Sequence, residues 1–370
     1  MENRIELIDS KEKFYQKKKE WTDFEKQVSG LQITNTFDYL FSFWDNFELV
    51  NSHDLGQSRV LTIIFYYKKN TLKAIFPFCK ITRNRKKIFK VRTIEFIGQQ
   101  FFTNYLDIIS DGLDIDDYSF VKKWIKSNLK YDFIHLSHIP EFSGNLKSFY
   151  KNKIYSYNHS SELMFDSAMT YEEFKFKVHS KNYRLNLNNL YNRLKKAEIK
   201  YDIFIKEFEL SDIPELIRLS EFKLETGKKN IYSYQNNLDF LESIYLTYQA
   251  KVIFISFNGK NICFGIMLRY KEDVFLYDMS FDRQYNKFWP GTMLFDFVLK
   301  NNIEESQYRT IFGWGMDFHK YQFCNKFYKL YNYLDSGNTL TSGFWYYLKK
   351  KGLKNLSVFF EVKSAENLKK

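Results

Sequence analysis

The sequence predicts an α/β protein with mixed sheets, organised as two related domains. The chain has 370 residues, which exceeds the usual size of a single domain. Hydrophobic residues make up 44% and aromatic residues 20%, enough for a sizeable core. Apolar runs with strand character alternate with helical stripes, and the order found in the first half recurs more fully in the second. We therefore expect domains over 1–165 and 166–370.

Each expected element of the first half rests on apolar periodicity and on turn residues. Between two of its strands, Lys68-Lys69-Asn70-Thr71 predicts a hairpin turn. In order, we expect helices over 11–28 and 37–47, strands over 59–67, 72–81, 88–97 and 105–109, a helix over 118–128 and a strand over 133–136.

The second half opens on a capping box, Thr170 with Glu173, which predicts a helix start. Ser180 begins a second helix, whose apolar stripe includes Leu187 and Leu194. Asn258-Gly259 predicts a tight turn between two later strands. The remaining expected elements are a strand over 201–206, helices over 212–226 and 236–248, strands over 252–257, 262–270 and 274–281, a loop over 282–290, a helix over 291–303, a strand over 308–314, a helix over 318–328, a strand over 329–335 and a terminal helix.

Bulk properties narrow the classes of protein. The net charge of +12 fits either a polyanionic partner or the Lys-rich usage of an AT-rich genome, and the dispersal of the basic residues favours the second. No nucleic-acid-binding module is recognised, so we expect no specific nucleic acid partner. Three separated cysteines and scattered histidines predict neither a disulfide framework nor a metal site. No signal peptide or membrane-spanning run is seen, which predicts a cytoplasmic protein.

The segment from Asp278 to Lys320 carries the most chemical information. A strand ends near Phe281, and a polar loop containing Arg283 and Lys287 leads to Pro290, Gly291 and Thr292 at the start of an apolar helix. A helix N-terminus offers free N–H groups and partial positive charge, Gly291 permits close approach, and the two basic residues add charge. This pattern predicts a phosphate-binding position, although Pro-Gly before a helix is also an ordinary turn.

Two glycines, Gly313 and Gly315, flank a tryptophan at the end of the next strand. Glycines there indicate a backbone that parts from its neighbour or is closely approached, as the pantetheine arm of an acyl-CoA requires. The alternative is a plain strand-to-helix turn.

An ordered set of motifs runs over residues 30–330. Its members are Phe37 with Trp44, Ala74-Ile75-Phe76-Pro77, Phe96-Ile97-Gly98, Tyr105-Leu106-Asp107, Ser180-Lys181-Asn182-Tyr183-Arg184, Phe264-Gly265-Ile266, Tyr277, Phe281-Asp282, Pro290-Gly291-Thr292 with Leu294, and Gly315 with Lys320. This set resembles the acetyltransferase family associated with cellulose biosynthesis (CelD/BcsL-like), a branch of the Gcn5-related N-acetyltransferase (GNAT) superfamily. More distantly, it resembles the Fem-type peptidoglycan aminoacyl transferases. The resemblance implies tandem GNAT-like domains in a Fem-like arrangement, with acyl-CoA as co-substrate.

Four residues are candidates for the chemistry. By resemblance to the Fem-type enzymes, Lys320 lies near the acceptor, where its charge would stabilise an oxyanion or the leaving thiolate. Asp317 and His319 flank it as candidate bases, with a helix cap and a packing role as their alternatives. Asp278, in mid-strand, suits base duty if it is buried, and otherwise faces solvent.

The resemblance also implies that Asp107, Tyr105 and Arg184 contact the acceptor, an amine-bearing small molecule, sugar or precursor of a bacterial cell-envelope polysaccharide. Surface ion pairs are the alternative for Asp107 and Arg184. The predicted activity is acyl-CoA-dependent N-acyl transfer. Two other functions stay open: a Fem-type transferase that uses aminoacyl-tRNA, and an inactive scaffold. The scaffold is suggested by Asn188 and Asn189, which stand where the family has arginines.

Overall fold

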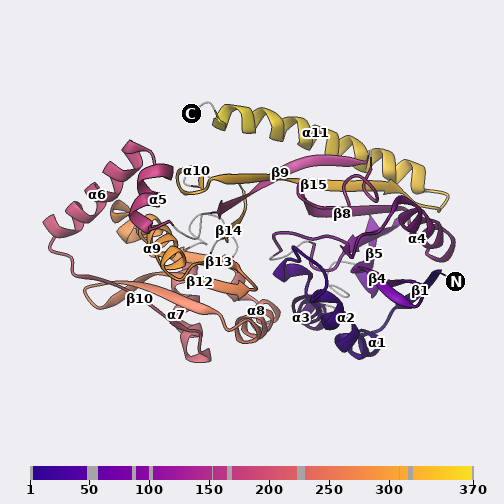
Figure 1. Ribbon diagram of the computed structural model, residues 1–370, viewed down its shortest axis with the longest axis horizontal. Helices are drawn as coiled ribbons and strands as arrows, with labels where there is room; N and C mark the ends of the chain where they lie inside the picture. The colour runs from indigo at the N-terminus through magenta and orange to yellow at the C-terminus, as the bar shows by residue number, and fades with distance from the viewer. Residues whose placement is uncertain are drawn as a thin grey trace. The chain divides into compact units, whose positions relative to one another are not determined.

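The computed structural model describes residues 3–47, 57–85, 89–99, 103–151, 153–164, 169–222, 230–307, 309–315 and 320–368 (Figure 1). The chain divides into two compact units: unit 1 contains Met1–His159 with Tyr328–Lys370, and unit 2 contains Ser160–Phe327. This division differs from the expected 1–165 and 166–370, because the last segment belongs to unit 1. None of the helices in the described part of the chain is long and apolar enough to cross a membrane.

The elements of unit 1 follow the expected order in outline. They are β1 (Asn3–Ile8), α1 (Lys11–Gln16), α2 (Lys18–Glu25), η1 (Ile33–Asn35), α3 (Phe37–Phe47), β2 (Gln57–Leu61), β3 (Ile63–Lys68), β4 (Thr71–Phe76), β5 (Phe78–Arg85), β6 (Phe89–Phe96), β7 (Ile109–Ser110), α4 (Ile115–Asn128), β8 (Phe133–Pro140), the first part of β9 (Ile154–Met164), most of β15 (Lys326–Ser336) and α11 (Ser342–Leu368).

Two sheets form unit 1, with strand orders β1-β3-β4-β7 and β2-β5-β6-β8-β15. Two runs expected as single strands each contribute to both sheets. The first breaks at Thr62, whose N–H donates to the Phe78 carbonyl at 3.0 Å. The second breaks at Pro77, which has no N–H to give to a ladder. The strand expected over 105–109 is reduced to β7, and β1 and β9 were not expected.

Unit 2 has the fuller version of the same plan. Its elements are the end of β9, α5 (Tyr171–Val178), α6 (Lys181–Lys196), β10 (Tyr201–Glu207), η2 (Leu210–Asp212), α7 (Ile213–Ser220), η4 (Ile231–Ser233), α8 (Gln235–Thr247), β11 (Lys251–Phe257), β12 (Lys260–Tyr270), β13 (Asp273–Phe281), η5 (Arg283–Phe288), α9 (Pro290–Glu304), β14 (Arg309–Trp314), α10 (Lys320–Phe323) and the start of β15.

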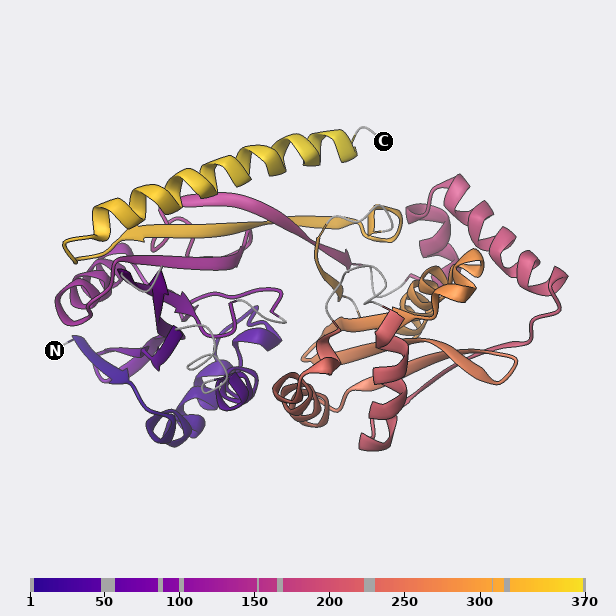
Figure 2. The same cartoon turned by 180° about the vertical axis from the view of Figure 1, so that it is seen from behind.

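The sheet of unit 2 has the order β10-β11-β12-β13-β14-β9 (Figures 1 and 2). Helices α6 and α9 pack on one face of it, and α7 and α8 pack on the other. Adjacent residues of β13 show this alternation: Met279 lies beside Gly291 of α9, whereas the Ser280 hydroxyl donates to the Leu219 carbonyl of α7 at 2.8 Å. The expected helix over 318–328 is only α10, because the chain is already a strand from Lys326.

Each unit contains one parallel strand pair joined by a helix, β6–α4–β8 in unit 1 and β13–α9–β14 in unit 2. The expected turns at Lys69-Asn70 and Asn258-Gly259 both form, with the left-handed backbone that tight hairpins need. The two units are therefore related in topology, as the recurring order of elements predicted.

Candidate functional site

The β13–β14 pair of unit 2 parts after a short stretch. The parallel register runs from Asp273–Arg309 to Phe275–Ile311, although β13 continues to Phe281 and β14 to Trp314. We call the segments beyond this point, 276–281 and 312–314, the fork. Backbone N–H and C=O groups that leave a ladder need other partners, so the fork is suited to pairing with an amide-bearing ligand.

A β-bulge lies at the fork. Ile266 of β12 faces Asp278, but Met267 faces Leu276, so Tyr277 is an extra residue in β13. A bulge bends its strand and increases its twist, which turns β13 away from β14. The Tyr277 ring packs edge-on against Tyr245 of α8, with 6.2 Å between centroids, and this contact holds the bulge in place.

The opposite end of the β13–β14 pair is clamped. Arg309 donates to both carboxylate oxygens of Glu162 in β9 at 2.7 Å, and to Asp273 of β13 at 3.1 Å. Glu162 is fully buried, and burial raises the pKa of Asp273 above its usual value. One end of the strand pair is therefore fixed by a bidentate ion pair, while the other end opens. Neither Glu162 nor Arg309 was singled out from the sequence, because their partners are distant in the chain.

Gly313 and Gly315 have φ values of +75° and +102°, which other residues rarely adopt. No described atom lies within 4 Å of a Cβ built on either glycine, so the space beside this backbone is open. The register between β14 and β9 also shifts between Ile311 and Trp314. These observations match the parting backbone that the two glycines predicted.

Lys320 begins α10 and is only 9% exposed. Its Nζ donates to the Gly313 carbonyl at 3.2 Å, which places the ammonium at the end of β14 beside the fork. Lys320 is therefore not one of the exposed lysines of the chain. Asp317 and His319, the other two candidates next to it, lie outside the described residues.

Asp278 is half-buried in β13 and lies on the α8 side of the sheet. It is close to the hydroxyl of Tyr232, which is 2.9 Å from the hydroxyl of Tyr245. Burial is the main cause that raises the pKa of Tyr232, and the nearby Tyr245 and Asp278 raise it further. Asp278 is thus placed at the fork with a protonated phenol as a neighbour.

The start of α9 forms the second part of the site. Arg283 and Lys287 are exposed on η5, and Trp289 enters the helix with a left-handed backbone, φ 49°. Among the described residues, no side chain of the N-cap residue Trp289 caps α9. Pro290 has no N–H, and the N–H groups of Thr292 and Met293 donate to the Trp289 carbonyl at 2.9 and 3.2 Å, so the Gly291 N–H and the helix dipole are what this end offers an anion. Thr292, in the first turn, is half-buried.

A Cβ on Gly291 would meet the side chains of Met279 and Phe281 at 3.4 and 3.5 Å, which are ordinary packing distances, so its role beside a phosphate stays a prediction. Gly265 of β12 is required by packing, because a Cβ there would lie 2.9 Å from Leu294 of α9. The loop before α9 is held by Arg193, which donates to the Lys287 carbonyl at 3.1 Å and stacks on Trp289 at 4.1 Å.

The residues expected to contact the acceptor belong to unit 1 (Tyr105 and Asp107) and to α6 (Arg184). Tyr105 is fully buried in unit 1, with its ring against Phe142. Asp107 accepts hydrogen bonds from Asn145 at 2.9 Å and Tyr150 at 2.8 Å, and burial raises its pKa. Tyr105 belongs to a packed interior, and the half-buried Asp107 is bonded to neutral side chains rather than to a surface cation, so the surface ion pair does not describe it. Their contact with an acceptor stays a prediction.

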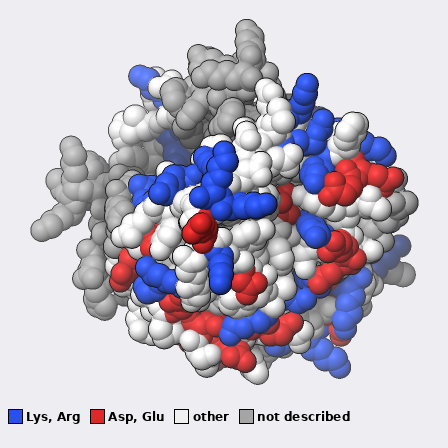
Figure 3. Space-filling view, turned by 90° about the vertical axis from the view of Figure 1, so that its left-hand side faces the viewer, with Lys and Arg blue, Asp and Glu red and all other residues white. Residues whose placement is uncertain are grey.

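Arg184 of α6 donates to the carbonyls at the end of α5, including that of Phe176 at 3.1 Å, and therefore caps that helix. It also lines a groove of about 530 Å³ between α5, α6 and α9, together with Lys175, Lys181 and Lys300. Asp296 lies in this groove, bonded to Tyr171 and Tyr191, and burial raises its pKa. Figure 3 shows the side of the molecule on which α6 lies in Figure 1. Lys and Arg side chains are gathered in the upper part of that view.

The parallel strand pair of unit 1 also parts after a short register, but there a side chain bonds to the backbone groups that are left. The β6–β8 register covers only Thr93–Phe133 and Ile94–Ile134. Beyond it, the Gln99 side chain accepts from the N–H groups of Phe96 at 3.3 Å and Ser137 at 3.0 Å, and donates to the His135 carbonyl at 3.0 Å. One amide side chain thus satisfies the backbone groups that a ligand amide would meet.

The helix of this second crossover is also different. Asp114 caps α4, and Asp117 closes the capping box from within its first turn. Two carboxylates at a helix N-terminus satisfy its N–H groups and repel phosphate. The combination of a filled fork and an acidic helix start distinguishes unit 1 from unit 2.

No group of three or more metal-ligating side chains occurs among the residues for which the structure gives positions. The groups that the structure brings to the candidate site are backbone groups of the fork, Lys320, Asp278 and the start of α9.

No protein-family model and no curated protein matches this sequence. Solved structures do match in fold. FemX has 9% sequence identity and a TM-score of 0.56, with 91% of this chain and 98% of FemX covered. L-PGS from Bacillus licheniformis has 12% identity and a TM-score of 0.51, covering 91% and 96%. A protein of unknown function from Bacteroides thetaiotaomicron has 10% identity and a TM-score of 0.50, covering 88% and 99%. The chain therefore has a mixed α/β fold similar to that of FemX, built from two units of related topology.

Proposed function

We propose that this chain is an acyl-CoA-dependent N-acyltransferase and that unit 2 binds the donor, with acetyl-CoA the first to test. The observation that carries the proposal is the fork, where a parallel strand pair stops after Phe275–Ile311 beside a helix start with no side-chain cap among the described residues. Together they would offer amide pairing for a pantetheine arm, and the Gly291 N–H with the positive end of the helix dipole for a pyrophosphate.

The residues around the fork have distinct roles in this proposal. Arg283 and Lys287 would add charge for the phosphates, and Thr292 lies in the helix turn that meets them. Lys320, beside the Gly313 carbonyl, would stabilise the negative charge that develops on the thioester oxygen. Asp278 would take the proton that the amine loses as the C–N bond forms and the C–S bond breaks.

The acceptor is proposed to be an amine on a small molecule, a sugar or a cell-envelope precursor. Because Asp107, Tyr105 and Arg184 have structural contacts, the acceptor is better sought near Asp278 and Lys320. A second candidate donor is an aminoacyl group, in keeping with the fold shared with FemX. Both donors would place an activated carbonyl at the fork, so the fork alone does not tell them apart. Titration with each kind of donor does.

Calorimetric titration of the full-length protein with acetyl-CoA, CoA and longer acyl-CoAs tests the proposal. Binding of CoA and its thioesters, weakened by Thr292→Glu, supports it. If no CoA species binds while the protein is folded, acyl-CoA dependence is ruled out. Release of an aminoacyl group from charged tRNA in the same preparation would then establish the second candidate.

A further inference from the structure

The start of α11 exposes several large apolar side chains close together in the chain. Leu340 and Tyr347 are 107% and 62% exposed, and Phe344 and Leu348 are 60% and 44% exposed. Their spacing of four, three and one residues puts them on one side of the helix and the turn before it. We call these four residues the α11 stripe.

The other side of α11 is occupied. Trp345, Tyr346 and Leu353 pack on Phe133 of β8 and Leu334 of β15 in unit 1. In Figures 1 and 2 the start of α11, in yellow, lies beside these two strands. The helix is therefore docked through one face, and the α11 stripe is held rigidly toward solvent.

Lysines continue the stripe along the helix. Lys351 and Lys354 are exposed, and each is seven residues beyond a member of the stripe, Phe344 or Tyr347. Residues 336–360 contain four lysines and no acidic residue. An anionic partner therefore meets no repulsion along this side of α11.

We propose that the α11 stripe docks the protein on an anionic lipid surface, with the helix lying in the plane of the interface. Large apolar and aromatic side chains followed by lysines are the pattern of an interfacial helix. The apolar end would enter the acyl boundary, and the lysines would reach the phosphates with their stems in the interface. A lipid surface fits better than an acidic protein, because the apolar side chains need a hydrophobic layer beside the anionic groups.

The test is co-sedimentation of the full-length protein with vesicles of phosphatidylcholine alone and of phosphatidylcholine with phosphatidylglycerol in equal parts. Wild type should bind the anionic vesicles, lose binding at high salt and bind neutral vesicles weakly. Lys351→Gln with Lys354→Gln should weaken partitioning by roughly 25-fold, from about fivefold for each basic residue. Phe344→Ser with Leu348→Ser should weaken it by more than about tenfold.

The matched control is Lys195→Gln with Lys196→Gln on α6. It removes the same charge from exposed positions that have no apolar stripe beside them, so it should leave vesicle binding intact. Because all six positions are exposed, thermal unfolding should be unchanged. Equal binding by wild type and the Phe344/Leu348 variant would overturn the proposal, as would an absence of binding to anionic vesicles. Sedimentation velocity adds a third outcome: a dimer that the Phe344/Leu348 variant splits would assign the stripe to a second copy of the chain instead.

Discussion

Arg309 of β14 donates two hydrogen bonds, each 2.7 Å long, to the buried carboxylate of Glu162 in β9. Glu162→Gln removes the negative charge that Arg309 faces on β9 and leaves that of Asp273 on β13. Breaking a buried ion pair by changing one partner costs about 3 kcal/mol of unfolding free energy, and we expect a loss of that size. Urea unfolding of unit 2, followed by tryptophan fluorescence, measures it.

The control is Glu172→Gln, which changes the exposed pair with Lys175. Exposed pairs contribute little, so this variant should unfold within about 0.5 kcal/mol of wild type. Equal effects of the two substitutions would show that the Arg309 clamp does not stabilise the β13–β14 pair.

Lys320→Ala should lower turnover more than donor binding. The lysine is buried against the Gly313 carbonyl, and its charge would act on an oxyanion that exists only during reaction. Losing one such contact costs about 10²–10³ in rate. Release of free thiol from acetyl-CoA with a panel of amines measures turnover, and calorimetry measures binding. Lys326→Ala, at an exposed position a few residues on, should change neither quantity.

Thr292→Glu should weaken CoA binding while keeping or raising thermal stability. A carboxylate in the first turn of α9 interacts favourably with the helix dipole, but it repels the phosphates that would bind there. Thr292→Val, which has the same shape and no charge, should bind CoA within a few-fold of wild type. A glutamate variant with unchanged affinity would place the phosphates away from α9.

Gln99→Ala should destabilise unit 1 without changing donor binding. The substitution leaves the N–H groups of Phe96 and Ser137 and the His135 carbonyl without their side-chain partner. Each unsatisfied buried group costs about 1–3 kcal/mol, so a loss of at least about 2 kcal/mol is expected. Gln99→Glu, which keeps both acceptor contacts, should lose less. If Gln99→Ala instead created a second CoA site, calorimetry would show a doubled stoichiometry.

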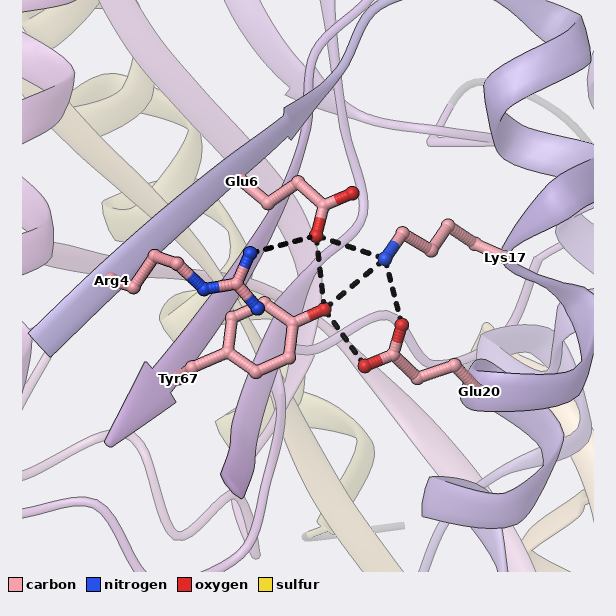
Figure 4. Close-up of polar contacts among 5 residues, drawn as sticks. All are labelled: Arg4, Glu6, Lys17, Glu20 and Tyr67. Carbon is pink, nitrogen blue, oxygen red and sulfur yellow. Dashed lines mark hydrogen bonds and ion pairs between the residues drawn. The ribbon is translucent and has the colours of Figure 1, made fainter. Parts of the chain in front are cut away.

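The network in Figure 4 predicts an acid-sensitive contact in unit 1. Burial favours a raised pKa for Glu6, but hydrogen bonds from Lys17 and Tyr67 and the charges of Lys17 and Arg4 outweigh it and lower the pKa. The stabilisation is therefore complete above the usual pKa of a glutamate and is lost as the pH falls through the lower folded value. Glu6→Gln should flatten this part of the stability–pH curve. An unchanged curve would exclude Glu6 as the titrating group.

The sequence predicted that the backbone parts near Gly313 and Gly315, because two glycines at the end of a strand are a local signal. It did not predict that Thr62 and Pro77 send strands into two sheets, since this depends on pairing with distant residues. The clamp of Glu162 and Arg309 was missed for the same reason. Tyr105 and Asp107 are predicted by resemblance, and only packing shows that Tyr105 is interior and that Asp107 is bonded to Asn145 and Tyr150. The Gln99 contacts have no sequence signal, because one glutamine among many carries no pattern.

The return of residues 328–370 to unit 1 has a consequence for synthesis of the chain. Strand β8 pairs with β15, which the ribosome makes almost two hundred residues later. Unit 2 lies wholly between these partners, so it can complete its sheet before unit 1 can. A nascent chain thus exposes the unfinished edge of β8 while unit 2 folds, and this interval is when the protein most needs protection from aggregation.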